Sequence, residues 1–364
     1  MFLENISIQN FRNITSACTG FTRPFTLVTG ENAQGKTNFL EAVHFLLSAQ
    51  SFADTTTEDL LQFEKPGFTV KGTVIKGNNR YDAVLSFFDR VKRVMVNAKA
   101  VHTMSEYRRF FPCIASSSRQ TEEFLRGPAW RRRMLDRLIS QVSSGYTALM
   151  KDYCRSLKNR NILLKDMACD PGLLEQYTRR LVSLCGNITR ERMQYLADFK
   201  TTYEKLFKGL FSALVPELKP FLTLDGIILR ESPGYEENFI SLSRKNNRLD
   251  RRYGYTTWGL SRSDFLFYLD RRPVLGYASR GQQKLIIMLL MLVQSEIIRE
   301  LESASPILII DDMFGEMGDR FINALLEYLR AFDQVFISNI HSNLGPGDND
   351  MITMKNGNPI KGVI

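Results

Sequence analysis

The chain has 364 residues, with 48 lysine and arginine residues against 39 aspartate and glutamate residues, which gives a formal net charge of +9. Hydrophobic residues make up 44% and charged residues 24%, a composition that excludes a disordered chain, a collagen-like repeat and a small disulfide-stabilised scaffold. At about 100–200 residues per domain, the length predicts two domains or one domain with a large insertion. The positive charge favours a polyanionic partner such as nucleic acid, but charge alone does not identify one.

The five cysteines are scattered and form no Cys-x-x-Cys pair, so we expect reduced thiols rather than a disulfide framework. The three histidines have no metal-ligand spacing, which argues against structural zinc. Glu4 lies where a signal peptide needs basic residues. The longest apolar run, Leu285–Val293, is about half of what crosses a bilayer. We therefore expect a cytoplasmic protein with no membrane partner.

The N-terminal part of the chain has the pattern of a sheet interrupted by one helix. Apolar, β-branched segments predict strands over residues 2–9, 25–29, 69–75, 81–87 and 91–96. The segment Lys76–Asn79 is a hairpin turn signal. A helix is predicted to begin at Lys36, because the apolar residues that follow repeat at helical spacing.

The middle of the chain changes to helical periodicity. Apolar residues three or four positions apart form one helical stripe from Leu135 to Leu157. A second stripe, with a wider gap after Ile188, runs from Leu174 to Leu206. The break at Asp170-Pro171-Gly172 predicts an antiparallel helical hairpin. We therefore predict that residues 122–211 are a helical arm inserted into an α/β domain of residues 1–121 and 212–364.

The C-terminal part alternates strands with helices. Strand patterns at 221–230 and 265–269 precede an apolar helix over 282–301, a strand over 307–310, a helix over 320–332 and a strand over 334–338. This alternation is typical of an α/β fold with a largely parallel sheet.

The segment between the second predicted strand and the first helix matches the phosphate-loop pattern G-x-x-x-x-G-K-[ST] at every fixed position. The predicted nucleotide-binding set is Gly30, Glu31, Asn32, Ala33, Gln34, Gly35, Lys36, Thr37 and Asn38. Glycines allow the backbone to approach phosphate oxygens, and the N terminus of the following helix favours an anion. We expect Lys36 to reach the β- and γ-phosphates of ATP in a catalytic role and the Thr37 hydroxyl to ligate Mg²⁺.

A second candidate site is an acidic pair at the end of an apolar strand. The run Pro306–Ile310 shows no alternation, as in a central strand covered on both faces, and ends at Asp311 and Asp312. Ligands of open α/β sheets bind at the carboxyl ends of strands. We predict that Asp311 holds Mg²⁺ and that Asp312 is the general base for an attacking water. The alternative is that the pair only caps a strand.

A third candidate site lies just before the long apolar helix. Ser279 is a favourable N-cap residue and Gly281 allows close approach by a ligand, so the segment Ser279, Arg280, Gly281 and Gln282 predicts a second anion-binding helix terminus. An ordinary N-cap is the alternative. In a head-to-tail pair with C2 symmetry, each nucleotide would lie between the phosphate loop of one protomer and this segment of the other. ATP would then hold the homodimer together, and hydrolysis would loosen it.

The S-R-G-Q-Q segment, the phosphate loop and the Asp-Asp strand end together resemble the signature set of ABC-type ATPases. Thr37 and Ser279 are 242 residues apart, which is too few for the long coiled coil of SMC and Rad50 proteins and matches the RecF family. Other segments that resemble this family are Asn10–Asn13, Gly127–Pro128, Arg131–Asp136, Tyr153–Asn161 and Gly254–Thr256.

The resemblance implies an ABC-type ATPase head with an inserted helical arm in a protein of DNA replication and repair. It also implies ATP-dependent dimerisation on DNA, slow hydrolysis of ATP, and help in loading recombinase at single-strand gaps with RecR and RecO. By family position, Arg12 lies beside the nucleotide. Two other interpretations stay open: an ATP-binding DNA clamp with little hydrolysis, and the ABC-type head of another DNA-processing or defence system.

Four segments depart from the family pattern. Gly315–Gly318 replaces S-E-L-D after the acidic pair, with Asp319 one residue late. Gly259–Asp264 replaces G-P-H-R-D-D, Ser116–Phe124 replaces F-x-P-E-D-L, and Ser338-Asn339 stands where threonines are common. These departures predict a divergent member whose hydrolysis rate or DNA preference differs from the family's.

Basic residues gather in three segments that are candidates for DNA contact. The segments contain Arg126, Arg131, Arg132, Arg133 and Arg137; Lys151, Arg155, Lys158, Arg160 and Lys165; and Arg244, Lys245, Arg248, Arg251 and Arg252. Phosphate contacts from such residues give sequence-independent, salt-sensitive affinity. Because a solvated helix face is the alternative for any one segment, we expect DNA to meet the collective positive surface.

Overall fold

The computed structural model describes residues 1–53, 55–101, 103–166, 168–206, 220–223, 235–264, 266–269, 272–302, 305–338 and 349–362. The chain divides into two compact units. The head comprises Met1–Glu123, Thr202–Pro216 and Ala278–Ile364, and the arm comprises Phe124–Thr201 and Glu217–Tyr277. Residues 122–211 were predicted to form the arm, whereas the structure groups Thr202–Pro216 with the head and Glu217–Tyr277 with the arm.

The head contains a six-stranded sheet in the order β15-β14-β3-β13-β12-β8. Its strands are β3 (Phe25–Thr29), β8 (Cys113–Ser117), β12 (Ile307–Asp311), β13 (Val335–Ser338), β14 (Asn349–Lys355) and β15 (Asn358–Gly362). All neighbours are parallel except the β14–β15 hairpin. Strands β12 and β13 are buried along their whole length, as a continuous apolar run predicts. The carboxyl ends of β3, β13, β12 and β8 therefore meet at one edge.

A second six-stranded sheet of the head is antiparallel, in the order β2-β1-β4-β5-β6-β7. Its strands are β1 (Phe2–Phe11), β2 (Ile14–Gly20), β4 (Gly67–Lys76), β5 (Asn79–Phe88), β6 (Val91–Val96) and β7 (Lys99–Ala100). The predicted hairpin turn is confirmed, because Lys76 pairs with Asn79 across it.

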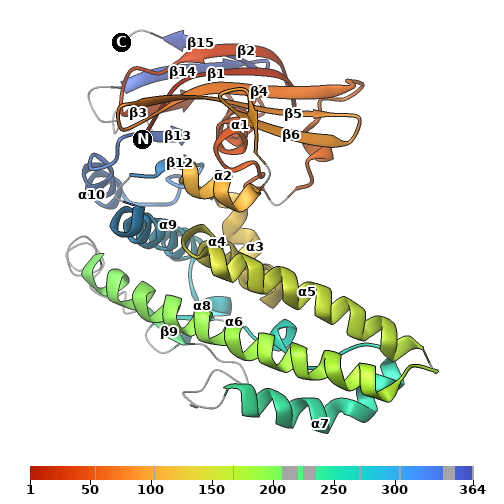
Figure 1. Ribbon diagram of the computed structural model, residues 1–364. Coiled ribbons are helices and arrows are strands. Elements are labelled where there is room, and N and C mark those ends of the chain that lie inside the picture. The colour runs from red at the N-terminus through yellow and green to blue at the C-terminus, as the bar shows by residue number, and fades with distance from the viewer. Residues whose placement is uncertain are drawn as a thin grey trace. The chain divides into compact units, whose positions relative to one another are not determined.

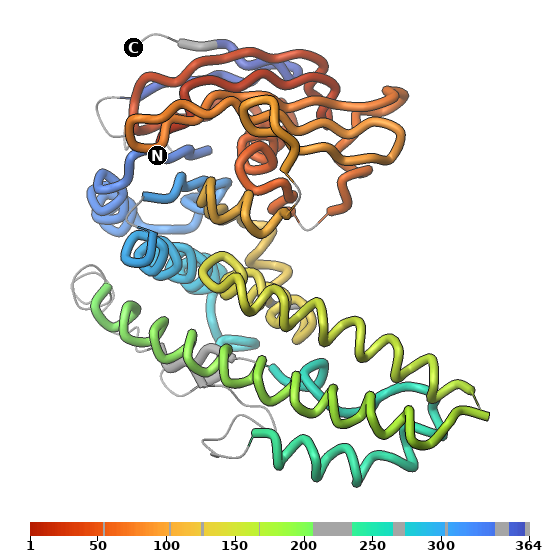
Figure 2. The backbone as a smooth tube through the Cα atoms, in the orientation of Figure 1, coloured from red at the N-terminus to blue at the C-terminus, as the bar shows by residue number. Residues whose placement is uncertain are grey.

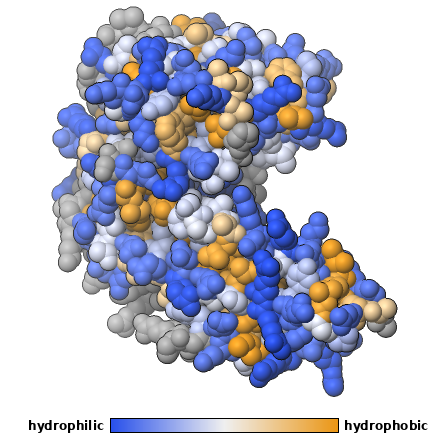
Figure 3. Space-filling view, viewed as in Figure 1, coloured by the Kyte–Doolittle hydropathy of each residue, from blue (hydrophilic) through white to orange (hydrophobic). Residues whose placement is uncertain are grey.

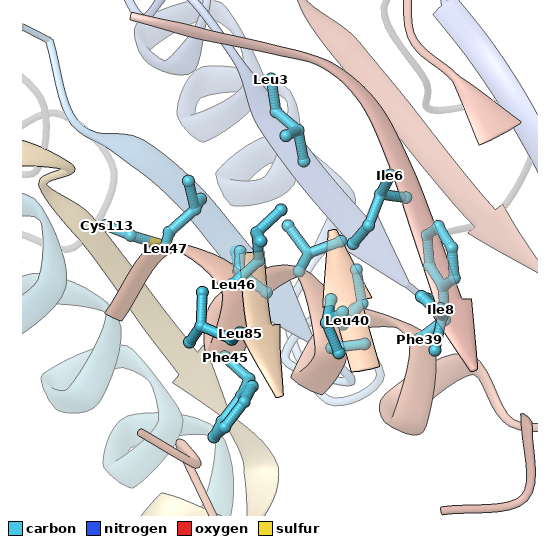
Figure 4. Close-up of a cluster of buried hydrophobic side chains, with 14 of the residues drawn as sticks. Leu3, Ile6, Ile8, Phe39, Leu40, Phe45, Leu46, Leu47, Leu85 and Cys113 are labelled. Carbon is cyan, nitrogen blue, oxygen red and sulfur yellow. The ribbon is translucent and has the colours of Figure 1, made fainter. Parts of the chain in front are cut away.

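Helix α1 (Lys36–Ser48) lies between the two sheets and contacts strands of both (Figure 1). Phe39, Leu40, Phe45, Leu46 and Leu47 of this helix pack in the main core cluster with residues of β1, β5 and β8 (Figure 4). Full burial of each such side chain contributes about 1.5–3 kcal/mol to stability. This packing fixes the first turn of α1 at the edge where the parallel strands end.

The described part of the head also contains helices α2 (Met104–Phe110), α9 (Arg280–Glu302) and α10 (Asp319–Leu329), together with a short 3-10 turn at Glu58–Leu60. Helix α9 packs against β8 and buries the whole run Leu285–Val293, so this apolar run belongs to the protein core. Within the described ranges, no helix combines the length and the apolar content that crossing a bilayer requires.

The arm is built mainly from helices α4 (Pro128–Val142), α5 (Ser144–Lys165), α6 (Pro171–Leu206) and α7 (Tyr235–Tyr253), as Figures 1 and 2 show. Helix α3 (Ser118–Arg126) leads into it from β8. The prediction of a single helix along the stripe Leu135–Leu157 is wrong. Ser143 is extended between α4 and α5, and its hydroxyl accepts a hydrogen bond from the Tyr146 amide at 3.2 Å.

A small antiparallel sheet, β11-β10-β9, completes the described part of the arm. It consists of β9 (Pro220–Thr223), β10 (Leu266–Leu269) and β11 (Arg272–Pro273), followed by the short helix α8 (Val274–Tyr277). Strands were predicted at both of the first two places, and most of the predicted strand 221–230 lies outside the described residues. Helix α7 was not predicted.

Candidate nucleotide-binding site

The predicted phosphate loop forms between β3 and α1. Gly30, Ala33 and Gly35 have φ values of 128°, 64° and 103°, and Gly35 is the N-cap of α1. A Cβ on Gly30 would lie 2.5 Å from the Met354 carbonyl oxygen, so only glycine fits there. Backbone of this kind turns successive amide groups inward and makes an anion-binding concavity at a helix N terminus.

The lysine and the threonine of the loop lie at the start of α1. The Lys36 Nζ donates hydrogen bonds to the carbonyl oxygens of Gly30 and Glu31 at 2.6 and 2.9 Å, and the side chain is buried beneath the loop. Glu31, Asn32 and Ala33 are exposed at the loop's tip. The ammonium group is thus held where it can meet phosphate oxygens at the mouth of the loop.

A hairpin from the far end of the chain supports the phosphate loop. The Asn356 amide, in the turn between β14 and β15, donates to the Gln34 side-chain oxygen at 2.6 Å, and the Gly357 amide donates to the Gln34 carbonyl at 3.0 Å. The Asn38 side chain donates to that of Asn13 at 2.8 Å. The hairpin was not predicted, although Asn356-Gly357 is a hairpin turn signal, and no local pattern indicates its contact with Gln34, more than 300 positions away.

The acidic pair lies beside the loop's threonine. Asp311 is buried at the end of β12 and accepts hydrogen bonds from the hydroxyl of Ser338, at 2.5 Å, and from that of Thr37. Burial raises the pKa of Asp311, and the neighbouring Asp312 adds to this effect. The two hydroxyl donors and Lys36 oppose it.

Asp312 turns away from β12 in a left-handed conformation, with φ of 54°. Its amide donates to the Ser338 hydroxyl at 3.1 Å, and its carboxylate accepts from the Ser118 hydroxyl at 3.2 Å. Ser118 follows β8 and Ser338 ends β13, the two strands that flank β12. Neither serine was assigned a role from the sequence, although Ser338 is the last residue of a predicted strand.

The Thr37 hydroxyl and the Asp311 carboxylate fit the predicted Mg²⁺ site. They are hydrogen-bonded to each other, and both offer the oxygen ligands that Mg²⁺ takes alongside substrate phosphates. Within the described residues no group of three or more His, Cys, Asp or Glu side chains could hold a metal ion. Thr37 and Asp311 would hold the cation together with the phosphates of a nucleotide.

The Ser279 segment caps α9. The Ser279 amide donates to the Gln282 side chain at 2.8 Å, and the Gln282 amide donates to the Ser279 hydroxyl at 3.3 Å, a reciprocal capping box. Ser279 and Arg280 are exposed. A Cβ on Gly281 would lie 3.0 Å from the Glu316 carbonyl oxygen, so this helix start packs closely against the segment that follows the acidic pair.

Arg12 occupies a different environment from the phosphate loop's residues. Its guanidinium forms a two-point ion pair with Glu41 of α1, at 2.9 and 3.2 Å, and donates to the Asp59 carbonyl at 2.9 Å. The structure therefore gives Arg12 a role in fixing α1 against the antiparallel sheet, while the predicted contact with the nucleotide stays a prediction.

A sequence profile of the RecF/RecN/SMC N-terminal domain matches residues 2–358. The chain belongs to this family. The RecF proteins of Exiguobacterium sp. and Bacillus subtilis, both described as DNA replication and repair proteins, are each 29% identical to it. The first match covers 90% of this chain and 89% of the relative, and the second covers 93% of each.

Solved structures of the RecF/RecN/SMC family agree with the profile. A structure of RecF with ATP, described as a recombination mediator protein in the RecFOR pathway, aligns with a TM-score of 0.90 at 26% identity and covers 100% of this chain and 98% of that one. A Smc head domain from Pyrococcus furiosus aligns with a TM-score of 0.56 at 13% identity, covering 99% and 96%, and supports the fold alone. The predicted ABC-type ATPase head and the resemblance to RecF are confirmed.

Two family segments of the arm hold it together through buried ion pairs. Arg160 lies 2.8 Å from Asp250, and both side chains are buried. Arg131 forms a two-point pair with Asp264 at 2.9 and 2.6 Å and is also buried. The inclusion of Arg160 and Arg131 among the DNA-contact candidates is therefore wrong, because each guanidinium is buried and ion-paired inside the arm.

The other predicted basic residues differ in exposure. Arg132 is half-buried and donates to the Ser263 carbonyl at 2.8 Å. The exposed ones are Arg133, Lys151, Arg155, Lys158, Lys165, Arg244, Lys245, Arg248, Arg251 and Arg252. The side chain of Arg126 lies outside the described residues. Most of the predicted positive surface is thus open to solvent, as a phosphate-binding surface must be.

Proposed function

We propose that this protein is an ATP-dependent DNA-binding protein of recombinational repair and replication, acting in the cytoplasm. The observation that carries the proposal is the hydrogen-bonded group of Thr37, Asp311, Ser338 and Asp312 at the mouth of a complete phosphate loop. The names of the RecF relatives and the ATP-bound RecF structure support the biological role.

These residues would have separate roles in ATP hydrolysis. Mg²⁺, when bound, neutralises charge on the β- and γ-phosphates. Lys36 orients the γ-phosphate and stabilises its negative charge, and Asp312 accepts the proton of the attacking water. Asp311 and Thr37 hold the cation. We propose that turnover is slow and stimulated by DNA.

Two chains would share each nucleotide. The N terminus of α9, with Ser279 and Arg280 exposed, offers a second anion site. In a head-to-tail dimer, that terminus would contact the γ-phosphate held by the partner's phosphate loop. Loss of the γ-phosphate removes the contact, so hydrolysis would release the dimer from DNA. We propose that this cycle supports recombinase loading at gapped DNA together with RecR and RecO.

A DNA clamp with little hydrolysis is the second candidate function. The observation that favours it is the segment Gly315–Gly318, which stands where the family has S-E-L-D. In this chain Glu316 of the segment packs against the start of α9. Lys284 of α9 lies 3.9 Å from Glu316, so this segment is tied to its own chain's signature helix.

Mass in solution tests the proposal. Light scattering with Mg²⁺ and no nucleotide, ADP or ATP, with and without gapped DNA, should show an ATP-dependent dimer for wild type and Asp312→Asn. Lys36→Ala and Ser279→Arg should stay monomeric, and a Ser279→Arg dimer equal to wild type would contradict the shared site. ATP turnover of wild type no faster than that of Asp312→Asn would favour the clamp.

A further inference from the structure

An exposed pair of tyrosines lies at the C-terminal end of α7. The rings of Tyr253 and Tyr255 are stacked, with centroids 5.8 Å apart and an angle of 23° between their planes. They are 52% and 44% exposed. Gly254, between them, has φ of +69°, which turns the chain so that both rings meet. Large aromatic groups side by side in solvent are typical of a binding surface.

Helix α7, which ends at Tyr253, carries four exposed arginines on one face. Arg244, Arg248, Arg251 and Arg252 fall at helical positions i, i+4, i+7 and i+8, which places them on one face of α7, and all are exposed. In the part of the chain that the structure describes, none of them forms an ion pair. The Arg252 guanidinium lies 6.0 Å from the centre of the Tyr253 ring.

Two more features lie beside α7. Lys165, the last residue of α5, packs against Gly254, with its Cγ 3.2 Å from where a Cβ would stand. A cavity of about 460 Å³ separates α6 from α7, which run alongside each other (Figures 1 and 2). It is lined in part by Arg179, Arg244, Asn247 and Arg251, with Glu175 and Glu236. Hydrophilic residues cover most of the visible surface (Figure 3).

We propose that Tyr253 and Tyr255 are a stacking platform for the bases of single-stranded DNA, whose phosphates contact Arg248, Arg251 and Arg252. Exposed rings can stack only on bases that are not already stacked in a duplex. Every base has a flat aromatic face, so this stacking tolerates any sequence. The arginines supply sequence-independent phosphate contacts. The cationic surroundings favour a nucleic acid over a protein partner. This proposal rests on the proposed function, since it names which strand of a gapped DNA the arm binds.

Binding of three labelled strands of equal length tests the platform: oligothymidylate, an abasic strand with the same charge, and a duplex. For the full chain, Tyr253→Ala and Tyr255→Ala should each weaken oligothymidylate binding about tenfold, which corresponds to about 1.4 kcal/mol for the loss of a stacked base. Binding of the abasic strand and the duplex should not change. Tyr253→Phe and Tyr255→Phe, which keep the rings, are the matched controls and should bind as wild type.

A spectroscopic variant gives an independent reading. The tryptophan fluorescence of Tyr255→Trp should be quenched by oligothymidylate and not by the abasic strand. The same substitution in a Tyr253→Ala background serves as the comparison. Equal binding of oligothymidylate and abasic strand by wild type, or no effect of the alanine changes, would overturn the platform and leave a protein partner as its occupant. Failure of wild type to bind the duplex would instead count against the proposed function.

Discussion

The Ser338 hydroxyl donates to the Asp311 carboxylate at 2.5 Å, and the same oxygen accepts the amide of Asp312 at 3.1 Å. One side chain on β13 therefore fixes the Asp311 carboxylate at the end of β12 and the backbone amide of Asp312, the next residue. Hydrogen bonds to charged groups are stronger than neutral ones, and removing one partner leaves a buried group unsatisfied. Ser338 is thus a positioning residue for the acidic pair.

Ser338→Ala should lower ATP turnover more than ATP affinity. Without the hydroxyl, Asp311 loses a donor and the Asp312 amide loses its acceptor, which costs about 1–3 kcal/mol of stability. Ser338→Thr keeps the hydroxyl and is the control. Steady-state turnover and nucleotide titration separate the two effects, and a Ser338→Ala enzyme with wild-type turnover would refute the positioning role.

Burial raises the pKa of Asp311 above its ordinary value of 3.8. The native carboxyl therefore binds its proton more tightly than the unfolded one, so the free energy of unfolding falls as pH rises from 3.8 through the native pKa. Asp311→Asn should consequently melt higher than wild type at pH 7 without ligands and gain no stability from Mg²⁺ with ATP. Asp319→Asn, which removes an exposed carboxylate of α10, is the control. Melting curves across pH check this, and an Asp311→Asn protein that melts lower at pH 7 would contradict it.

Gly30→Ala should abolish nucleotide binding and destabilise the head. An added Cβ would stand 2.5 Å from the Met354 carbonyl oxygen on β14, so the loop or the strand must move. Gly77→Ala is the matched control, because it also has positive φ but open space around it. It should cost only the backbone strain of about 1–2 kcal/mol. Calorimetric titration with ATP distinguishes the two, and equal effects would mean that the Met354 contact is unimportant.

Arg160 and Arg155 lie on the same helix, but their substitution by glutamine should affect different properties: stability for Arg160 and DNA binding for Arg155. Arg160→Gln leaves the buried Asp250 carboxylate without its cationic partner and should destabilise the arm by about 3–5 kcal/mol. Arg155→Gln removes an exposed charge and should change stability by less than about 0.5 kcal/mol. It should instead reduce the salt dependence of DNA binding. Urea unfolding and DNA titrations at several salt concentrations measure both, and similar unfolding curves for the two variants would contradict the buried pair.

Local sequence patterns predicted the parts of the fold that depend on neighbouring residues. The phosphate loop is a strand, a loop and a helix in succession, and β12 is one unbroken apolar run, so both could be identified. The break at Ser143 was missed because the apolar stripe continues across it at helical spacing. Helix α7 was missed because its exposed face is polar and basic and it buries few apolar side chains.

The contacts that sequence reasoning missed join distant segments. Ser118 and Ser338 reach the acidic pair only because β8 and β13 flank β12 in the sheet. Arg131 and Arg160 resemble surface cations until the fold brings Asp264 and Asp250 to them. Side-chain chemistry thus predicted the type of site, while strand order and long-range ion pairs determined which residues complete it.

Mixing two inactive variants tests the shared nucleotide site most directly. Lys36→Ala lacks a working phosphate loop, and Ser279→Arg lacks a working signature helix. In a head-to-tail dimer of the two, one site combines the intact loop of one chain with the intact helix of the other. We predict that the mixture, with ATP and DNA, regains dimerisation and up to about half of wild-type turnover per dimer. A mixture that is as inactive as its components would contradict the account, provided that calorimetry shows both variants to be folded.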